Sequence, residues 1–89
     1  MQANELDNYK IELGECIHKM RKTQGHKVRP FAMLADIEHH QLINIEKGRV
    51  DLRVSTLIKI CNALDILPKQ LLAAAFDNGS VFPDPEVDK

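Results

Sequence analysis

The side chains best suited to hydrogen-bond chemistry gather in one short stretch of the chain, residues 39–47. On a helix with about 100° between successive residues, Leu42 and Ile45 point to one side, as core anchors do. The opposite side and its flanks hold His39, His40, Gln41, Ile43, Asn44 and Lys47. Asn and Gln amides can pair with adenine, His can donate to guanine, and an exposed Ile can contact a thymine methyl group. An ordinary solvated helix face, however, also contains residues of these types.

Basic side chains stand on both sides of this stretch: Lys27 and Arg29 precede it, and Arg49 and Arg53 follow it. The whole chain has a net charge of −1, yet residues 18–59 carry +5, while residues 1–17 and residues 60–89 each carry −3. A basic segment between acidic ends is expected where a chain contacts phosphate, although a mixed solvated surface can give the same distribution. We expect these four side chains to contact DNA phosphates rather than bases.

Other kinds of chemistry find little support in the sequence. Glu38, His39 and His40 are adjacent, so their side chains diverge on a helix. Within residues 39–47, none of them has a His, Cys, Asp or Glu four positions along the chain that could complete a zinc site. The chain has no nucleophile beside a base and no glycine-rich phosphate loop, so we expect no enzyme activity and no cofactor. Cys16 and Cys61 lack paired spacing and indicate reduced, structural thiols in a cytoplasmic protein.

The spacing of apolar residues predicts five short helices. They are expected over residues 8–23, from Pro30 to about 35, and over residues 39–47, 54–64 and 68–76. Pro30 should begin the second helix and keep Arg29 out of it, and Gly25 should cap the first helix in left-handed geometry. No apolar stretch approaches the roughly 20 residues of a membrane span. The fold class is therefore all-α, within one domain.

Residues 29–48 have the features that a helix-turn-helix needs. Ala32 is small enough for two helix axes to approach each other. In the turn Asp36-Ile37-Glu38, Asp36 can take the left-handed conformation, and Ile37 can serve as the apolar plug that the turn requires. Leu42 and Ile45 then anchor the second helix and leave its other face for the major groove.

These residues resemble the Cro and phage-repressor (XRE-like) helix-turn-helix family over about residues 13–72. The resemblance rests on matching segments in register: Met20-Arg21-Lys22, Phe31-Ala32, Ile45-Glu46-Lys47-Gly48, and Thr56-Leu57 through Ala63-Leu64. The sequence departs from the family at Asp36 and Asp65, where Gly is usual, and at Val28, where the family commonly has a phosphate-clamping Gln. The resemblance implies that Arg21 and Glu46 form a partly shielded ion pair that fixes the recognition helix.

The resemblance further implies a compact five-helix, lambda-repressor-like domain. We expect an acidic lead-in over residues 1–8, the domain over residues 9–76 and an extended acidic tail over residues 77–89. The implied function is a sequence-specific, double-stranded-DNA-binding transcriptional regulator, a repressor, that reads the major groove with helix 39–47.

Two expectations concern partners. We expect a homodimer formed through helix 68–76 and the following segment, with apolar surface from Leu71, Leu72, Phe76, Val81 and Phe82. The alternative function is an antitoxin-like or partner-binding module with weak or no specific DNA binding. The near-neutral net charge favours this alternative, as do Met33 and Leu34, which stand where the family usually has polar residues.

Overall fold

The computed structural model describes residues 3–76, with side chains from Glu5 onward, and all its regular elements are helices. They are α1 (Ala3–Thr23), α2 (Val28–Ala35), α3 (His39–Glu46), α4 (Val54–Leu64) and α5 (Pro68–Phe76). The all-α fold with five helices is therefore confirmed. The expected tail over residues 77–89 lies outside the described residues.

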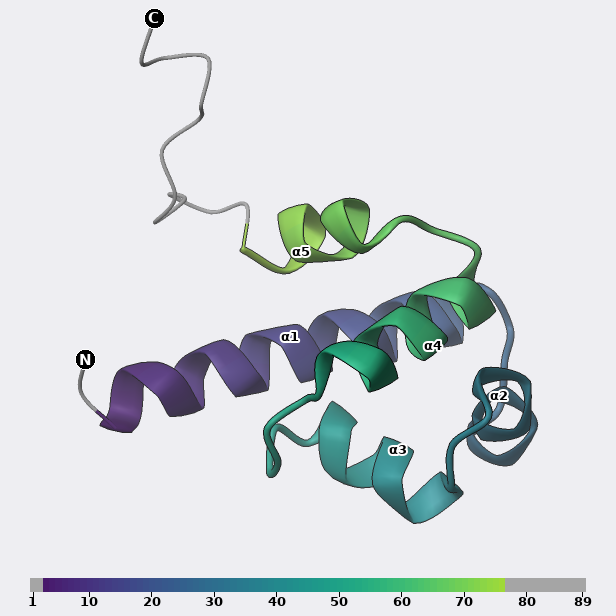
Figure 1. Cartoon of the computed structure of the whole chain (residues 1–89), viewed down its shortest axis with the longest axis horizontal. Coiled ribbons are helices and arrows are strands. Elements are labelled where there is room, and N and C mark those ends of the chain that lie inside the picture. The colour runs from purple at the N-terminus through teal and green to yellow at the C-terminus, as the bar shows by residue number, and fades with distance from the viewer. Residues whose placement is uncertain (1–2, 77–89) are drawn as a thin grey trace, which may run out of the picture.

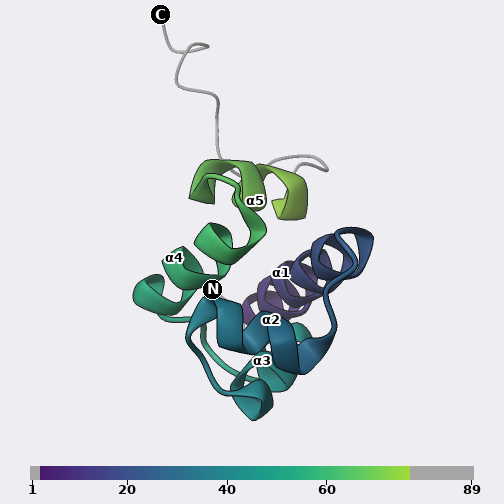
Figure 2. The ribbon, with the colours of Figure 1, turned by 90° about the vertical axis from the view of Figure 1, so that its right-hand side faces the viewer.

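The long helix α1 and the helix α4 form the middle of the molecule, with α5 on one side and the pair α2–α3 on the other (Figures 1 and 2). Helix α1 contacts α3 and α5, while α4 contacts α2 and α5. All five helices supply buried side chains to one core: Ile17, Phe31, Ala32, Ala35, Leu42, Ile45, Ile60, Cys61, Leu64 and Leu71. None of the described helices is long and apolar enough to cross a membrane.

Two helices begin earlier than the sequence predicts. Helix α1 starts at Ala3. Its first turns are mostly polar and add nothing to the apolar stripe, so apolar spacing does not reveal them. Helix α2 starts at Val28, so the prediction that Pro30 keeps Arg29 out of the helix is wrong. Pro30 is the third helical residue, and the N–H groups of a first turn have no partner within the helix, so proline loses no hydrogen bond there.

The predicted left-handed turns are present. Asp36 (φ 59°) and Asp65 (φ 60°) both take the left-handed conformation at the ends of α2 and α4. After Asp36, the Ile37 N–H donates to the Ala32 carbonyl at 3.0 Å, and the Ile37 side chain packs against the core. The turn therefore joins α2 to α3 in the way that residues 36–38 predict.

Candidate nucleic-acid interface

Helix α3 has one buried face and one open face. Leu42 and Ile45 are buried in the core. His40, Gln41 and Lys47 are exposed, and His39, Ile43 and Asn44 are half-buried. The structure therefore keeps all six candidate base-reading side chains off the core.

The four candidate phosphate contacts lie at the ends of neighbouring helices. Lys27 is the N-cap residue of α2 and Arg29 lies in its first turn, while Arg49 lies between α3 and α4 and Arg53 is the N-cap residue of α4. All four are exposed. The Arg49 Nη1 group lies 3.4 Å from the Asn44 Oδ1 atom, which makes a long and weak hydrogen bond. Asn44 and Arg49 are thus neighbours on the open surface.

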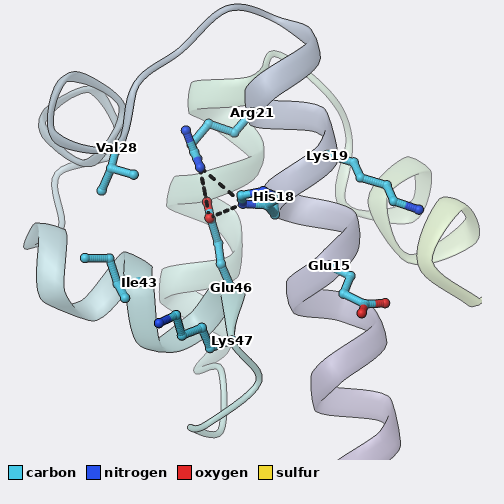
Figure 3. Close-up of a pocket in the computed structure, with 8 residues that line it drawn as sticks. All are labelled: Glu15, His18, Lys19, Arg21, Val28, Ile43, Glu46 and Lys47. Atoms are coloured by element: carbon cyan, nitrogen blue, oxygen red, sulfur yellow. Dashed lines mark hydrogen bonds and ion pairs between the residues drawn. The ribbon is translucent and has the colours of Figure 1, made fainter.

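A nearly buried ion pair joins α1 to the last residue of α3 (Figure 3). Arg21 Nε donates to Glu46 Oε2 at 2.6 Å and Arg21 Nη2 donates to Oε1 at 3.1 Å. The remaining Nη1 group donates to the His26 carbonyl at 2.7 Å. The side chains of Arg21 and Glu46 are only 5% and 8% exposed. A bidentate pair of this kind fixes both position and orientation of the carboxylate.

His18 is a third member of this cluster, and the sequence patterns did not predict it. Its Nδ1 atom lies 2.7 Å from Glu46 Oε1 and 3.2 Å from Arg21 Nη2. His18 precedes Arg21 by three residues and therefore shares its helix face. The spacing alone does not indicate this role for His18, because the role depends on Glu46 of α3 lying opposite the two side chains in the fold.

Two glycines let α1 approach the end of α3 closely. A Cβ atom on Gly14 would overlap the carbonyl oxygen of Ile45 and would come within 2.7 Å of that of Glu46. A Cβ atom on Gly48 (φ +71°) would lie 2.7 Å from the Ile11 Cα atom. Neither close approach follows from local sequence patterns, because both depend on where α1 crosses the end of α3. Backbone contact and the Arg21–Glu46 pair together hold α3 against α1.

Two further groups of titratable side chains are the adjacent His39 and His40 and the two cysteines. The His39 and His40 rings lie 4.1 Å apart, and within residues 3–76 no group of three metal-binding side chains comes together. Desolvation and the neighbouring His40 and Arg29 lower the pKa of His39, against the opposing effect of Glu38. Burial raises the pKa of the Cys61 thiol and, despite nearby Lys19, that of Cys16, which leaves both thiols protonated.

Solved structures with the same fold are known. The restriction-modification controller protein C.AhdI from Aeromonas hydrophila superposes with a TM-score of 0.67 at 23% identity, covering 68% of this chain and 92% of that one. The clp gene regulator ClgR from Corynebacterium glutamicum superposes with a TM-score of 0.74 at 22% identity, covering 83% and 96%. A second ClgR structure gives a TM-score of 0.72 at 24% identity, covering 75% and 71%. Comparison with curated protein sequences finds no match.

A family model provides the direct link between sequence and fold. The model described as "Helix-turn-helix domain" matches residues 14–75, which include the second half of α1, all of α2, α3 and α4, and α5 up to its last residue. This match agrees with the resemblance to XRE-like proteins carried by the segments around Arg21, Ala32 and Glu46. The chain belongs to the helix-turn-helix domain family, of the XRE type.

Proposed function

We propose that the chain is a sequence-specific transcriptional regulator that binds double-stranded DNA with α3 in the major groove. The observation that carries this proposal is the way in which α3 is held in the fold and what its open face presents. Its apolar side is sunk into the core, its last residue is fixed by a bidentate ion pair to α1, and its open side presents hydrogen-bonding groups. A helix that must read base edges needs this combination of a rigid mounting and a polar outer face.

The open surface divides naturally into reading and positioning groups. Asn44 and Gln41 can bind adenine edges, His40 and Lys47 can donate to guanine, and Ile43 can contact a thymine methyl group. His39 stands at the start of the same helix. Lys27, Arg29, Arg49 and Arg53 would contact the sugar–phosphate backbone on either side of the groove.

The solved neighbours support a regulatory role in general terms, since their names describe a restriction-modification controller and a clp gene regulator. For this chain we infer repression, because a bound domain can block transcription simply by occupying the promoter. Such a regulator would act in the cytoplasm of a bacterial cell, where the DNA is. A promoter–reporter assay with the chain expressed in trans distinguishes repression from activation by the sign of the change.

The base-reading and phosphate-contacting roles can be separated with two variants. We expect Asn44→Ala to weaken binding to the preferred duplex by about 1–3 kcal/mol and to relax the preference at one base pair. We expect Arg49→Ala to weaken binding to preferred and scrambled duplexes alike and to lower the salt slope by roughly one per subunit. Fluorescence anisotropy on both duplexes at two salt concentrations measures these effects.

Because Asn44 and Arg49 are in contact, the double variant belongs in the same experiment. A coupling energy well below the single effects would show that the two roles are separate. If Asn44→Ala affects both duplexes alike and Arg49→Ala affects only the preferred one, the two assignments are reversed. If neither variant changes binding, α3 does not present this face to DNA.

One observation favours the alternative of a protein-interaction module. Met33 and Leu34 on α2 are 81% and 60% exposed. Neighbouring large apolar side chains in such a position often mark a surface that binds another protein. A module of that kind would bind DNA weakly and without sequence preference. Gel-shift titrations with a selected duplex and with total genomic DNA separate the two functions, because only a sequence-specific regulator prefers the selected duplex at physiological salt.

We further infer a homodimer, because two copies double the base contacts and match half-sites about 34 Å apart. The apolar surface that α5 can offer to a second copy of the chain is smaller than the sequence suggests. Leu71 is fully buried and the Phe76 ring packs edge-on against Tyr9 at 5.4 Å, whereas Leu67 and Leu72 remain exposed. Val81 and Phe82 lie outside the described residues.

We expect sedimentation equilibrium at tens of micromolar to give a dimer for the parent chain. Leu72→Lys should shift it toward monomer without unfolding it, because Leu72 is exposed. Lys69→Ala, also exposed on α5, is the control and should stay dimeric. A parent chain that stays monomeric, with and without DNA, would contradict the dimer.

A further inference from the structure

A cleft of about 650 Å³ lies between α1 and the α2–α3 pair (Figure 3). Val28, Ile43 and Lys47 form one wall, and His18 of α1 lies on the other. Ile43 and Lys47 belong to the proposed groove-reading face, and Val28 stands between Lys27 and Arg29. A duplex that contacts both sets of residues would bring its sugar–phosphate backbone near the mouth of this cleft.

Most polar groups at the back of the cleft already have partners. Both oxygens of Glu46 accept hydrogen bonds, and the Arg21 guanidinium donates to Glu46 and to the His26 carbonyl. Val28 and Ile43 have no polar side-chain atoms. His18 is different, because its Nδ1 atom faces Glu46 while the side chain as a whole is 48% exposed. Among the described residues, its Nε2 atom has no hydrogen-bond partner.

The position of Glu46 determines which proton the His18 ring carries. The Nδ1 atom lies 2.7 Å from Glu46 Oε1. Arg21 Nη2 also lies 3.2 Å from this nitrogen, but it already donates to Glu46 Oε1. Because a carboxylate only accepts hydrogen bonds and its contact with Nδ1 is the shorter one, this nitrogen holds the ring proton. In the neutral ring the Nε2 atom is then a bare lone pair, which repels a phosphate oxygen. Only the protonated ring donates from both nitrogens, to Glu46 through Nδ1 and outward through Nε2.

We propose that His18 is a DNA phosphate contact that forms only when its ring is protonated. This inference rests on the proposed DNA-binding function and makes DNA binding depend on protonation of His18. Binding then takes up protons from solvent near neutral pH, at most one per subunit, because the contact forms only with the imidazolium. DNA affinity therefore rises as the pH falls through the range in which histidine gains its charge.

The charges around His18 act in both directions. Glu46 on α3 and Glu15 on α1 are the negative groups that line the cleft. Arg21 and Lys19 on α1 and Lys47 on α3 are the positive ones. From the side of α2 the cleft is lined by Val28, which is uncharged. A DNA phosphate entering the cleft adds a negative charge beside the ring and offsets the opposing cations, so the extra proton is acquired on binding.

The test compares the parent chain with His18→Asn. The Asn amide nitrogen takes the place of Nδ1 and keeps the hydrogen bond to Glu46, but it has no group in the place of Nε2. A duplex of about 30 base pairs of mixed sequence suffices as the probe, since phosphate contacts do not depend on sequence. Affinity is measured against salt concentration at about pH 6 and about pH 8, with thermal melting as a check on folding.

At the lower pH we expect the parent chain to bind roughly tenfold more tightly than His18→Asn, with a salt slope steeper by about 0.9 per subunit. At the higher pH the two proteins should have equal slopes. His26, His39 and His40 are present in both proteins, so their own titrations cancel. A purely structural role of His18 would not change the salt slope with pH.

Equal salt slopes at both pH values would overturn the proposal and leave DNA binding intact. Absence of salt-dependent binding by the parent chain at either pH would overturn the proposed function, and this inference with it. If His18→Asn fails to fold, NMR of the parent chain decides. The His18 ring should become protonated when the duplex is added near neutral pH, and a ring that stays neutral refutes the contact.

Discussion

Replacing Glu46 with Ala should lower the free energy of unfolding by about 3–5 kcal/mol, because it leaves the buried Arg21 guanidinium without its carboxylate. Arg21 is only 4% exposed, and two of its three nitrogens donate to Glu46. Urea or thermal unfolding measures the loss. DNA affinity should fall as well, since α3 loses the contact that sets its angle against α1.

Two further variants make this result specific. Glu15 is an exposed carboxylate on the neighbouring surface of α1. Glu15→Ala should therefore change stability by no more than about 0.5 kcal/mol. The double variant Arg21→Met, Glu46→Leu should be less destabilised than Glu46→Ala, because no charge is left buried and unpaired. If Glu46→Ala unfolds like the parent chain and binds DNA equally well, the ion pair does not hold α3.

Gly48→Ala should cost about 2–5 kcal/mol of stability from two separate sources. The φ angle of Gly48 is +71°. Left-handed backbone of this kind disfavours any L-residue by roughly 1–2 kcal/mol. The new Cβ would also lie 2.7 Å from the Ile11 Cα atom. Helix α1 or the loop after α3 must then move, at a further cost of about 1–3 kcal/mol.

Gly25→Ala is the matched control for Gly48→Ala. Gly25 has a similar φ angle of +81°, but nothing lies within 4 Å of a Cβ at that position. It should therefore show only the conformational cost of about 1–2 kcal/mol. Denaturant unfolding of both variants beside the parent chain measures the two losses. Equal losses would mean that α1 and the end of α3 are not in close backbone contact.

Local sequence patterns are sufficient for most of the fold. The predicted limits of the helices at residues 54–64 and 68–76 agree with the structure, because apolar spacing, the turn at Asp65 and Pro68 all point to the same boundaries. The start of α1 differs from the prediction because a polar first turn leaves no apolar periodicity to detect. The start of α2 differs because proline is tolerated throughout a first turn and does not mark the first helical residue.

The site was less accessible to sequence reasoning where it depends on contacts between distant helices. The Arg21–Glu46 pairing follows from the family resemblance, and no local pattern indicates it. His18 joins the pair only because α1 crosses the end of α3. Gly14 is visible in the sequence as an interruption of the apolar face between Leu13 and Ile17. Its role as a point of close helix approach follows only from the position of the Ile45 and Glu46 carbonyl groups.

The central claim is that α3 reads DNA sequence, and selection of bound duplexes from a random pool tests it most directly. We expect enrichment of one palindromic site with half-sites about one helical turn apart. That site should bind at least about a thousandfold more tightly than a scrambled duplex at physiological salt. A pool that stays random after repeated selection, with equal affinity for all duplexes, would contradict the claim.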